Sequence, residues 1–343
     1  MITANAHEIM TALAQRVVGQ DQAIRTLSTL FGMHLHWFAT PDVEHTAPNA
    51  LLIGPTGVGK THAVRTAAES FQIPLVVVDA ASLNLRGQGG TSFEDVLFQL
   101  IARARQTIRS GVLQRSFGDS DELDEVSFAM RGVVVIDEFD KLTVARDFNS
   151  HNLLLQRKLL EFVDGATVTL DSGSTLGGRE IHFDTAGLLF VAAGTFSDLD
   201  SSVSQRSHVT MRSLQHPEGI IAEDFVRYGF LPELVARFPV LVQFAPLTSS
   251  SLELILQTPA VSPVVFYDRY LASLGTTLVI SDSVMARLAS MAERLGMGVR
   301  GLHQTLFPLM ALLCRDIEDN PRSHYRIDDA DLQQLLKRTR GGE

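Results

Sequence analysis

The sequence is poor in the residues that crosslink small secreted domains and in the long apolar runs that cross membranes. One cysteine, Cys314, occurs in 343 residues, which excludes an internal disulfide and a cysteine-rich zinc site and favours a reducing, cytoplasmic location. Strongly apolar stretches, such as residues 186–193, are far shorter than the roughly 18 residues that span a bilayer. The start of the chain lacks the basic and apolar regions of a secretory signal. We therefore expect no membrane anchor.

Basic residues are outnumbered by acidic ones. The chain has 29 Lys and Arg against 39 Asp and Glu, a formal net charge of −10. This charge disfavours a nucleic-acid coat, because binding to polyanions depends on a surplus of Lys and Arg. The 45% of hydrophobic residues argues against a disordered chain. At roughly 150 residues per domain, the length predicts about two domains.

Four short apolar runs alternate with helix-compatible stretches. The runs are residues 49–53, 75–79, 133–137 and 188–192. They do not alternate with polar residues, which is typical of strands buried on both faces. Helical patterns at 93–109 and 152–163 lie between them, and this order predicts an α/β fold with a mostly parallel sheet covered by helices.

Strand signals become rare after Pro246. Ser281 and Asp282 precede apolar residues at positions 284, 288, 291 and 295, which share one helical face. The sequence thus predicts a large domain over residues 1–246, including an N-terminal helical segment, and a small, mainly helical domain over residues 247–343. The acidic residues between 119 and 125 are expected to form a solvated loop.

Residues 54–61 form a phosphate-binding motif. They read Gly-Pro-Thr-Gly-Val-Gly-Lys-Thr, which matches G-x-x-x-x-G-K-[ST], and they lie between an apolar strand and a helix-compatible segment. The alternative, a glycine turn that matches the motif by chance, would not be expected between a strand and a helix. Backbone N–H groups of such a loop converge on phosphate oxygens, Lys60 can reach the β and γ phosphates, and the Thr61 hydroxyl can ligate Mg²⁺. The expected nucleotide ligands are Gly54, Pro55, Thr56, Gly57, Val58, Gly59, Lys60 and Thr61.

A pair of carboxylates follows the third apolar run. Asp137 and Glu138 end the sequence Val-Val-Val-Ile-Asp-Glu, as in a Walker B motif. Asp137 would hold the Mg²⁺ shell, and Glu138 would polarise the water that attacks the γ phosphate. The alternative is an acidic strand end at a surface. The pair favours an ATPase over a small-molecule kinase, and no NKxD-type guanine-reading sequence occurs, so ATP and Mg²⁺ are the expected cofactors.

Together with further segments in the same order, these motifs make the chain resemble the AAA+ unfoldases of the Clp type, ClpX and its relative HslU. The segments are 17–23, the P-loop, 135–142, 190–196 and 223–240. The resemblance runs from about His7 to Leu306. It implies an ATP hydrolase that works as a ring, a homo-hexamer in that family, and that remodels or unfolds a protein or a protein complex.

The resemblance also implies roles for residues outside the Walker motifs. Val17 and Val18 would line the adenine pocket, unless they only pack in a core. Thr195 would act as sensor 1 and orient the attacking water or the γ phosphate. Arg237 would be an arginine finger that reaches the neighbouring subunit, or else a surface salt-bridge residue. Arg300 would act as sensor 2 and couple hydrolysis to domain motion, or else be an ordinary arginine at a helix start.

The sequence departs from the family in three places. We expect the family's N-terminal zinc-binding domain to be absent. The segment 196–219 is shorter than in the family and lacks the Ile-Gly-Phe tripeptide that docks on ClpP, so we expect no ClpP partner. In the pore loop, the family's Gly-Tyr-Val-Gly aligns with residues 87–90, and Gln88 replaces the gripping aromatic residue. The loop is either without a special role or suited to a different, polar substrate. Residues 177–182 resemble a weakened second pore loop or a solvated hairpin.

Two other functions stay open. An ATP-gated assembly or recruitment switch would bind a partner or nucleic acid without threading a polypeptide, and a pore loop without an aromatic residue allows this. A nucleic-acid remodeller would use Arg103, Arg105, Arg109 and Arg115, but such arginines more often belong to a solvated face or to intersubunit salt bridges, and the net charge disfavours this function. The histidines lack metal-ligand spacing, so no metal other than the Mg²⁺ of ATP is expected.

Overall fold

The chain forms two compact units. The computed structural model describes residues 5–39, 48–85, 89–110, 124–144, 150–171, 180–197, 199 and 220–341. The first unit comprises Met1–Leu13, Gln22–Gly54 and Lys60–Gln243. The second comprises Ala14–Asp21, Pro55–Gly59 and Phe244–Glu343. The domain boundary expected between residues 246 and 247 stays a prediction.

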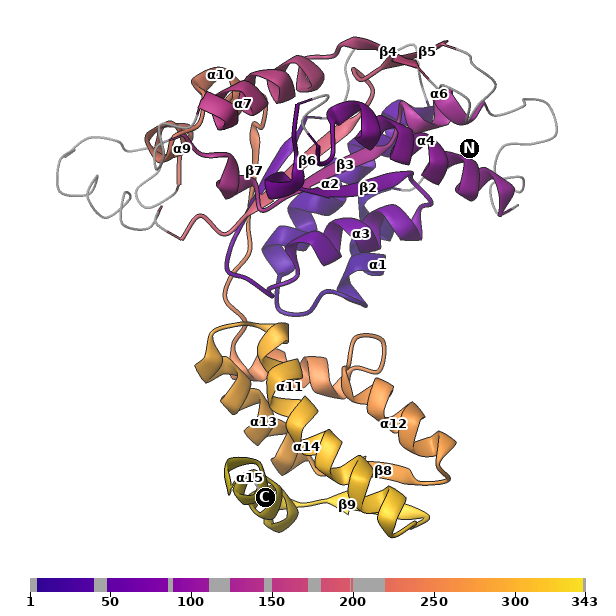
Figure 1. Cartoon of the computed structure of the whole chain (residues 1–343), viewed down its shortest axis with the longest axis vertical. Helices are drawn as coiled ribbons and strands as arrows, with labels where there is room; N and C mark the ends of the chain where they lie inside the picture. Colours follow the sequence, from indigo (N-terminus) through magenta and orange to yellow (C-terminus); the bar gives the residue numbers. More distant parts are fainter. Residues whose placement is uncertain are drawn as a thin grey trace. The chain divides into compact units, whose positions relative to one another are not determined.

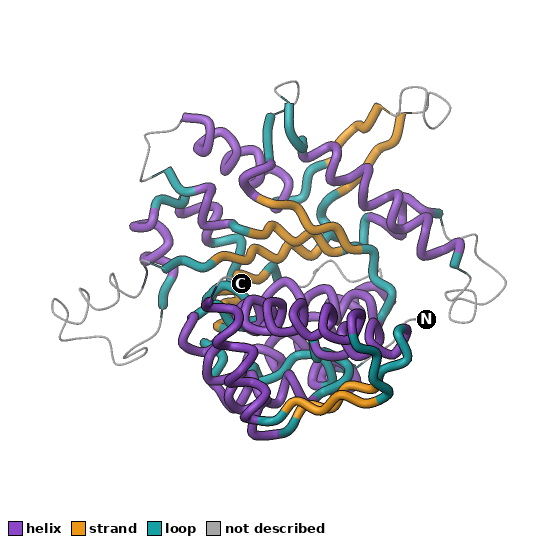
Figure 2. Tube along the Cα trace, turned by 60° about the horizontal axis from the view of Figure 1, so that its bottom comes forward, coloured by secondary structure: helices purple, strands orange, loops and turns teal. Residues whose placement is uncertain are grey.

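A five-stranded parallel sheet forms the centre of the first unit, in the order β2-β3-β6-β1-β7. Its strands are β1 (Ala50–Ile53), β2 (Leu75–Asp79), β3 (Val133–Asp137), β6 (Leu189–Gly194) and β7 (Val240–Gln243). Figure 2 shows them side by side. The α/β expectation is confirmed. Because all five strands are parallel, their carboxyl ends share one edge, where Asp79 lies opposite Asp137 and Ile53 opposite Gly194.

Helices cover the sheet because successive strand residues point to opposite faces. One face packs Val76, Val78 and Ile136 against a single hydrophobic core shared with α4 (Phe93–Arg109), α6 (Glu125–Ala129) and α7 (Ser150–Val163). The helix α3 (Lys60–Ser70) contacts β2 and β3, and Figure 1 shows it on the side of the sheet away from α7. The helices α1 (Ala6–Ala14) and α2 (Asp21–Ala39), except for Ala14 and Asp21, also belong to this unit.

The end of the acidic segment that the sequence predicts as a solvated loop is the start of a helix, since Asp124 and Glu125 begin α6. Asp124 is the N-cap of α6, and its side chain accepts a hydrogen bond from the Ser127 N–H at 3.0 Å. Glu125 forms a two-bond ion pair with Arg105 of α4, which lowers the pKa of the Glu125 carboxyl. Residues 119–123 and Arg115 lie outside the described residues. Arg105 is thus paired within its own chain, which neither the nucleic-acid role nor the intersubunit salt bridge considered for this helix predicts.

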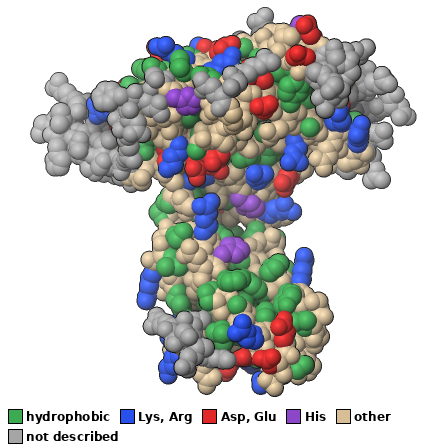
Figure 3. Space-filling view, in the orientation of Figure 1, with side chains coloured by type: hydrophobic (Ala, Val, Ile, Leu, Met, Phe, Trp, Pro, Cys, Tyr) green, Lys and Arg blue, Asp and Glu red, His purple; other side chains and the backbone are tan. Residues whose placement is uncertain are grey.

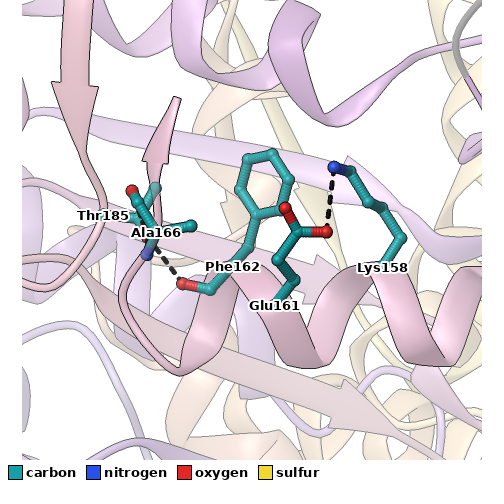
Figure 4. Close-up of polar contacts among 5 residues, drawn as sticks. All are labelled: Lys158, Glu161, Phe162, Ala166 and Thr185. Carbon is teal, nitrogen blue, oxygen red and sulfur yellow. Dashed lines mark hydrogen bonds and ion pairs between the residues drawn. The ribbon is translucent and has the colours of Figure 1, made fainter. Parts of the chain in front are cut away.

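A small antiparallel hairpin follows α7. It pairs β4 (Thr167–Asp171) with β5 (Glu180–Asp184), so residues 180–182 lie in a strand, while 172–179 fall outside the described part of the chain. Thr185, next to β5, joins the hairpin to the end of α7. Its hydroxyl donates to the Phe162 carbonyl at 2.7 Å and accepts from the Ala166 N–H at 2.9 Å (Figure 4). The C-terminal end of α7 is therefore held in place.

The second unit is mainly helical. Its elements are α11 (Ser249–Gln257), α12 (Val264–Ser273), β8 (Thr277–Ile280), α13 (Asp282–Leu295), α14 (Val299–Asp319), β9 (His324–Ile327) and α15 (Asp329–Gly341). The parallel pair β8–β9 was not expected from the sequence. The expected apolar face of α13 is also wrong at its end, because Leu295 is 49% exposed and Ala292 is buried instead. Large apolar side chains such as Phe266 and Phe307 are exposed, and Figure 3 shows hydrophobic groups over the visible helices of this unit.

None of the helices in the described ranges is both long enough and apolar enough to span a membrane.

His34 is a buried titratable group of the first unit. It lies on α2, and its Nε2 is 2.9 Å from the Arg131 carbonyl oxygen, so this nitrogen carries the proton of the neutral ring. Burial lowers the pKa of His34 from 6.5 to about 4, although the bond to Arg131 partly opposes the shift. Because the folded pKa lies below the unfolded one, the neutral ring stabilises the fold above pH 6.5, and this contribution is lost as the pH falls toward 4.

We expect His34→Gln to reduce the acid sensitivity of the fold. A glutamine keeps an N–H donor for Arg131 and does not titrate, so the variant should lose less stability between pH 7 and pH 4.5, by on the order of 2 kcal/mol. Urea unfolding at the two pH values measures this difference. The control His7→Gln changes an exposed histidine and should behave as the wild type. Equal acid sensitivity of His34→Gln and wild type would contradict the proposed burial effect.

Candidate nucleotide-binding site

The loop 54–59 lies where the motif predicts it. The strand β1 ends at Ile53, and α3 begins at Lys60. Gly57 has a positive φ of 75°, and a β-carbon on it would come within 2.2 Å of the Met297 carbonyl oxygen. Gly59 also has a positive φ, 99°. Only glycine adopts these conformations readily, so the backbone of the loop requires glycine at positions 57 and 59.

The first unit brings together Lys60, Thr61 and the end of β3. The Thr61 Oγ1 donates a hydrogen bond to Asp137 Oδ2 at 2.7 Å. Lys60 is buried, and its Nζ donates to the Gly54 carbonyl at 2.5 Å. Hydroxyl and carboxylate oxygens are the ligands that Mg²⁺ prefers, and here one of each lies at contact distance. These residues therefore fit Mg²⁺, and the buried ammonium at the loop fits a phosphate.

Glu138 has an unusual backbone. Its φ and ψ are 53° and 37°, the left-handed conformation that non-glycine residues rarely adopt. The short helix η2 (Phe139–Leu142) follows it, and the Lys141 N–H donates to the Glu138 carbonyl at 2.9 Å. The side chain is exposed, whereas Asp137 is half-buried. Strained residues of this kind are concentrated at functional sites.

Thr195 directly follows β6 and is bound to a residue that sequence reasoning did not single out. Its hydroxyl donates to Asp140 Oδ2 at 3.0 Å, and its N–H donates to Oδ1 at 3.3 Å. Asp140 is buried and belongs to η2. The signal available was a further acidic residue two positions after Glu138. Because the Thr195 proton points to Asp140, the hydroxyl oxygen is left to accept a hydrogen bond from a water molecule.

The second unit holds the other predicted nucleotide contacts. Gln20 binds Ala245 twice, donating to its carbonyl at 2.8 Å and accepting from its N–H at 3.0 Å. This fixes the segment of Val17 and Val18, of which Val17 is buried and Val18 half-buried. The Gly57 carbonyl accepts from the Val299 N–H at 3.0 Å. The loop 55–59 therefore contacts the start of α14, where the neighbouring Arg300 is exposed.

Arg237 follows the short helix α10 (Pro232–Val235) and pairs with another carboxylate. Its Nε donates to Asp164 Oδ1, just after α7. The side chains are 54% and 38% exposed, respectively, so this is a surface ion pair of small energetic weight. The Asn49 side chain donates to the Arg237 carbonyl at 3.1 Å, which ties its backbone to the start of β1. An exposed arginine on a fixed backbone is able to exchange its partner when another anion approaches.

Comparison with known proteins identifies the family. Residues 46–241 match the sequence model of the AAA domain, Cdc48 subfamily, which is more than half of the chain. The chain is 28% identical to the ATP-dependent Clp protease ATP-binding subunit ClpX of Bacteroides thetaiotaomicron, over 96% of this chain and 81% of that protein. It is 29% identical to ClpX 3 of Methylococcus capsulatus, over 94% of this chain and 79% of that protein. The expected resemblance is thus confirmed: the chain belongs to the AAA domain family, is ClpX-like, and is an ATPase.

Proposed function

We propose that this ATPase works as a ring of identical subunits, six by family analogy, and uses ATP hydrolysis to remodel or unfold a protein or a protein complex. The observation that carries the proposal is the contact of Thr61 with Asp137, which joins the two Walker motifs at the carboxyl edge of the sheet. The relatives, whose names describe them as ATP-binding subunits of a Clp protease, support the choice of a protein substrate.

Each residue near the Walker motifs has a proposed part in the reaction. The backbone N–H groups of 54–59 and the Lys60 ammonium hold the phosphates. Thr61 and Asp137 hold Mg²⁺, which when bound neutralises phosphate charge. Glu138 takes a proton from the attacking water. Thr195, held by Asp140, accepts a second hydrogen bond from that water and so orients it.

The remaining predicted residues act on the base, on the γ phosphate and across the ring. Val17 and Val18 line the adenine pocket, and Arg300 contacts the γ phosphate as sensor 2. Arg237 leaves Asp164 and enters the site of the neighbouring subunit, where its charge stabilises the transition state. If the arginine comes from a neighbouring subunit, the site of a single chain lacks a catalytic group. We therefore propose a closed ring, in which every site is completed by a neighbour.

We further propose that the ring works in the cytoplasm without ClpP. The proposal is supported by the missing Ile-Gly-Phe tripeptide in 196–219, most of which lies outside the described residues. The names of the relatives point the other way, since they describe subunits of a protease. Gln88 and its neighbours Arg86 and Gly87 also lie outside the described residues.

A trap variant tests the ring's interaction with a substrate. Immobilised Glu138→Gln protein should retain a specific protein or complex in ATP and release it in ADP, because ATP that is bound but not hydrolysed freezes the substrate-bound ring. Mass spectrometry of the eluate identifies it, and gel filtration in ATP measures the oligomer. Equal retention in both nucleotides, or a monomer at every concentration in ATP, would contradict the proposed function.

A further inference from the structure

The side chain of Gln156, on α7, is 0% exposed, and both its nitrogen and its oxygen are hydrogen-bonded. Its Nε2 donates to the Leu142 carbonyl at 2.8 Å and to the Gly229 carbonyl at 3.1 Å. Its Oε1 accepts from the Leu231 N–H at 2.8 Å. A buried amide with three bonds to backbone groups fixes those groups relative to one another, since leaving any of them unpaired would be costly.

The three partners belong to two functional segments. Leu142 ends η2, the short helix that follows Glu138 and contains Asp140. Gly229 is the C-cap of α9 (Ala222–Tyr228), and Leu231 is the N-cap of α10, which leads to Arg237. One side chain therefore joins the turn after the Walker B motif to the segment that carries the proposed arginine finger.

Aromatic packing follows the same path. The Phe139 ring of η2 stacks on the Phe230 ring with centroids 4.8 Å apart and an interplanar angle of 11°. It also lies 5.6 Å from the ring of Phe238, which is adjacent to Arg237. In addition, the Val144 N–H donates to the Gly229 carbonyl at 3.2 Å. A shift of η2 would thus press on both ends of α10.

The helix that carries Gln156 is itself anchored. Thr185 holds its last turn through the Phe162 carbonyl, as Figure 4 shows, and Asp164 beyond that turn pairs with Arg237. The segment 229–237 is consequently fixed at one end by Gln156 and at the other by Asp164, both supplied by α7 or the residue after it.

We propose that Gln156 is a positioning residue for Arg237: it couples the turn after Glu138 to the arginine's segment, so that each subunit presents Arg237 correctly to its neighbour. This inference rests on the proposed trans role of Arg237. It predicts that loss of the amide damages the neighbouring subunit's site more than the subunit's own site, a pattern that a purely structural role would not produce.

Gln156→Met tests this because methionine has a similar length and no amide. We expect ATP turnover of the pure variant to fall at least tenfold, since displacing a catalytic group by about 1 Å can cost 100-fold, while affinity for a fluorescent ATP analogue stays within twofold. Mixed with excess Glu138→Gln subunits, which supply an intact Arg237, each Gln156→Met subunit should regain at least half of wild-type turnover.

Asn152→Leu is the matched control. The Asn152 amide donates to the Lys141 carbonyl at 3.1 Å and the Thr143 carbonyl at 3.0 Å, so it supports the same turn without touching the segment 229–237. Any loss in this variant should not be restored by mixing. Failure to restore Gln156→Met, or equal restoration of both variants, would overturn the proposal. If Gln156→Met does not fold, Gln156→Glu, which keeps the acceptor for Leu231, replaces it with the same expected results.

Arg237→Ala, mixed with Glu138→Gln in the same way, separates the role of Gln156 from the trans role of Arg237. If Arg237→Ala is restored and Gln156→Met is not, the inference about Gln156 is wrong and the proposed function stands. If neither is restored, the trans role of Arg237 fails and the inference falls with it.

Discussion

Replacement of Glu138 by glutamine is expected to lower ATP turnover at least 100-fold and to leave ATP binding intact. Glutamine has the same shape as glutamate but cannot take a proton from water, and general bases contribute about 10²–10⁴ to rate. The left-handed backbone at position 138, with φ 53°, is no more strained with glutamine than with glutamate, so the melting temperature of the protein should not change. Phosphate release and equilibrium binding of a fluorescent ATP analogue measure the two effects separately.

The control for this result is Glu293→Gln, which makes the same chemical change at an exposed position of α13. It should turn over ATP at the wild-type rate. If Glu138→Gln also retained turnover within a few-fold of wild type, Glu138 would not be the group that activates water, and the exposed carboxylate would have to be reassigned as an ordinary surface residue.

Replacement of Arg237 by alanine is expected to have the second large effect on ATP turnover. We expect turnover to fall by at least 100-fold, because an arginine that stabilises transition-state charge contributes about 10³–10⁵ in related nucleotide hydrolases. Folding should be almost unaffected, since the pair with Asp164 is about half exposed and such pairs contribute less than about 1 kcal/mol. Phosphate release measures the loss of turnover, and thermal unfolding measures the effect on stability.

Mixing experiments decide whether Arg237 acts across subunits. Arg237→Ala subunits contain an intact Glu138, and Glu138→Gln subunits contain an intact Arg237, so a mixed ring should regain turnover that neither variant has alone. Arg227→Ala removes another exposed arginine of the same region and should need no rescue. A mixture as inactive as its components would show that Arg237 does not complete a neighbour's site.

The sequence predicts four of the five strands of the sheet, including the edge strand β2, and misses the other edge strand, β7. The runs at β1, β3 and β6 are buried on both faces, so they contain unbroken apolar residues, which is a strong local signal. In β7, whose sequence Val-Leu-Val-Gln is also mostly apolar, only Val242 is buried, and the run is missed although it has the composition of a strand. The prediction that Leu295 is buried is wrong for a different reason. Its spacing fits the apolar face of α13, but helix spacing alone does not show where the packed surface ends.

In the nucleotide-binding site, too, some residues could be predicted from the sequence and others could not. The P-loop is contiguous, and its glycine, lysine and threonine positions follow from local backbone chemistry. The contact of Thr61 with Asp137 follows once the parallel order of the sheet is known. Asp140 and Gln156 could not be assigned from the sequence, because their partners lie 55 and 75 residues away and are hydroxyl or backbone groups without a sequence signature. The trans role proposed for Arg237 comes from the family resemblance, because the site that it would complete belongs to another subunit.

One measurement tests most directly whether ATP hydrolysis by this ring changes the structure of a protein. The protein captured by Glu138→Gln is purified, and its amide hydrogen exchange is followed with wild-type ring in ATP, in ADP, and with Glu138→Gln in ATP. We expect protected amides of the captured protein to exchange rapidly only with wild-type ring in ATP. ATP-dependent binding with unchanged protection would contradict remodelling and identify the protein as an ATP-gated switch.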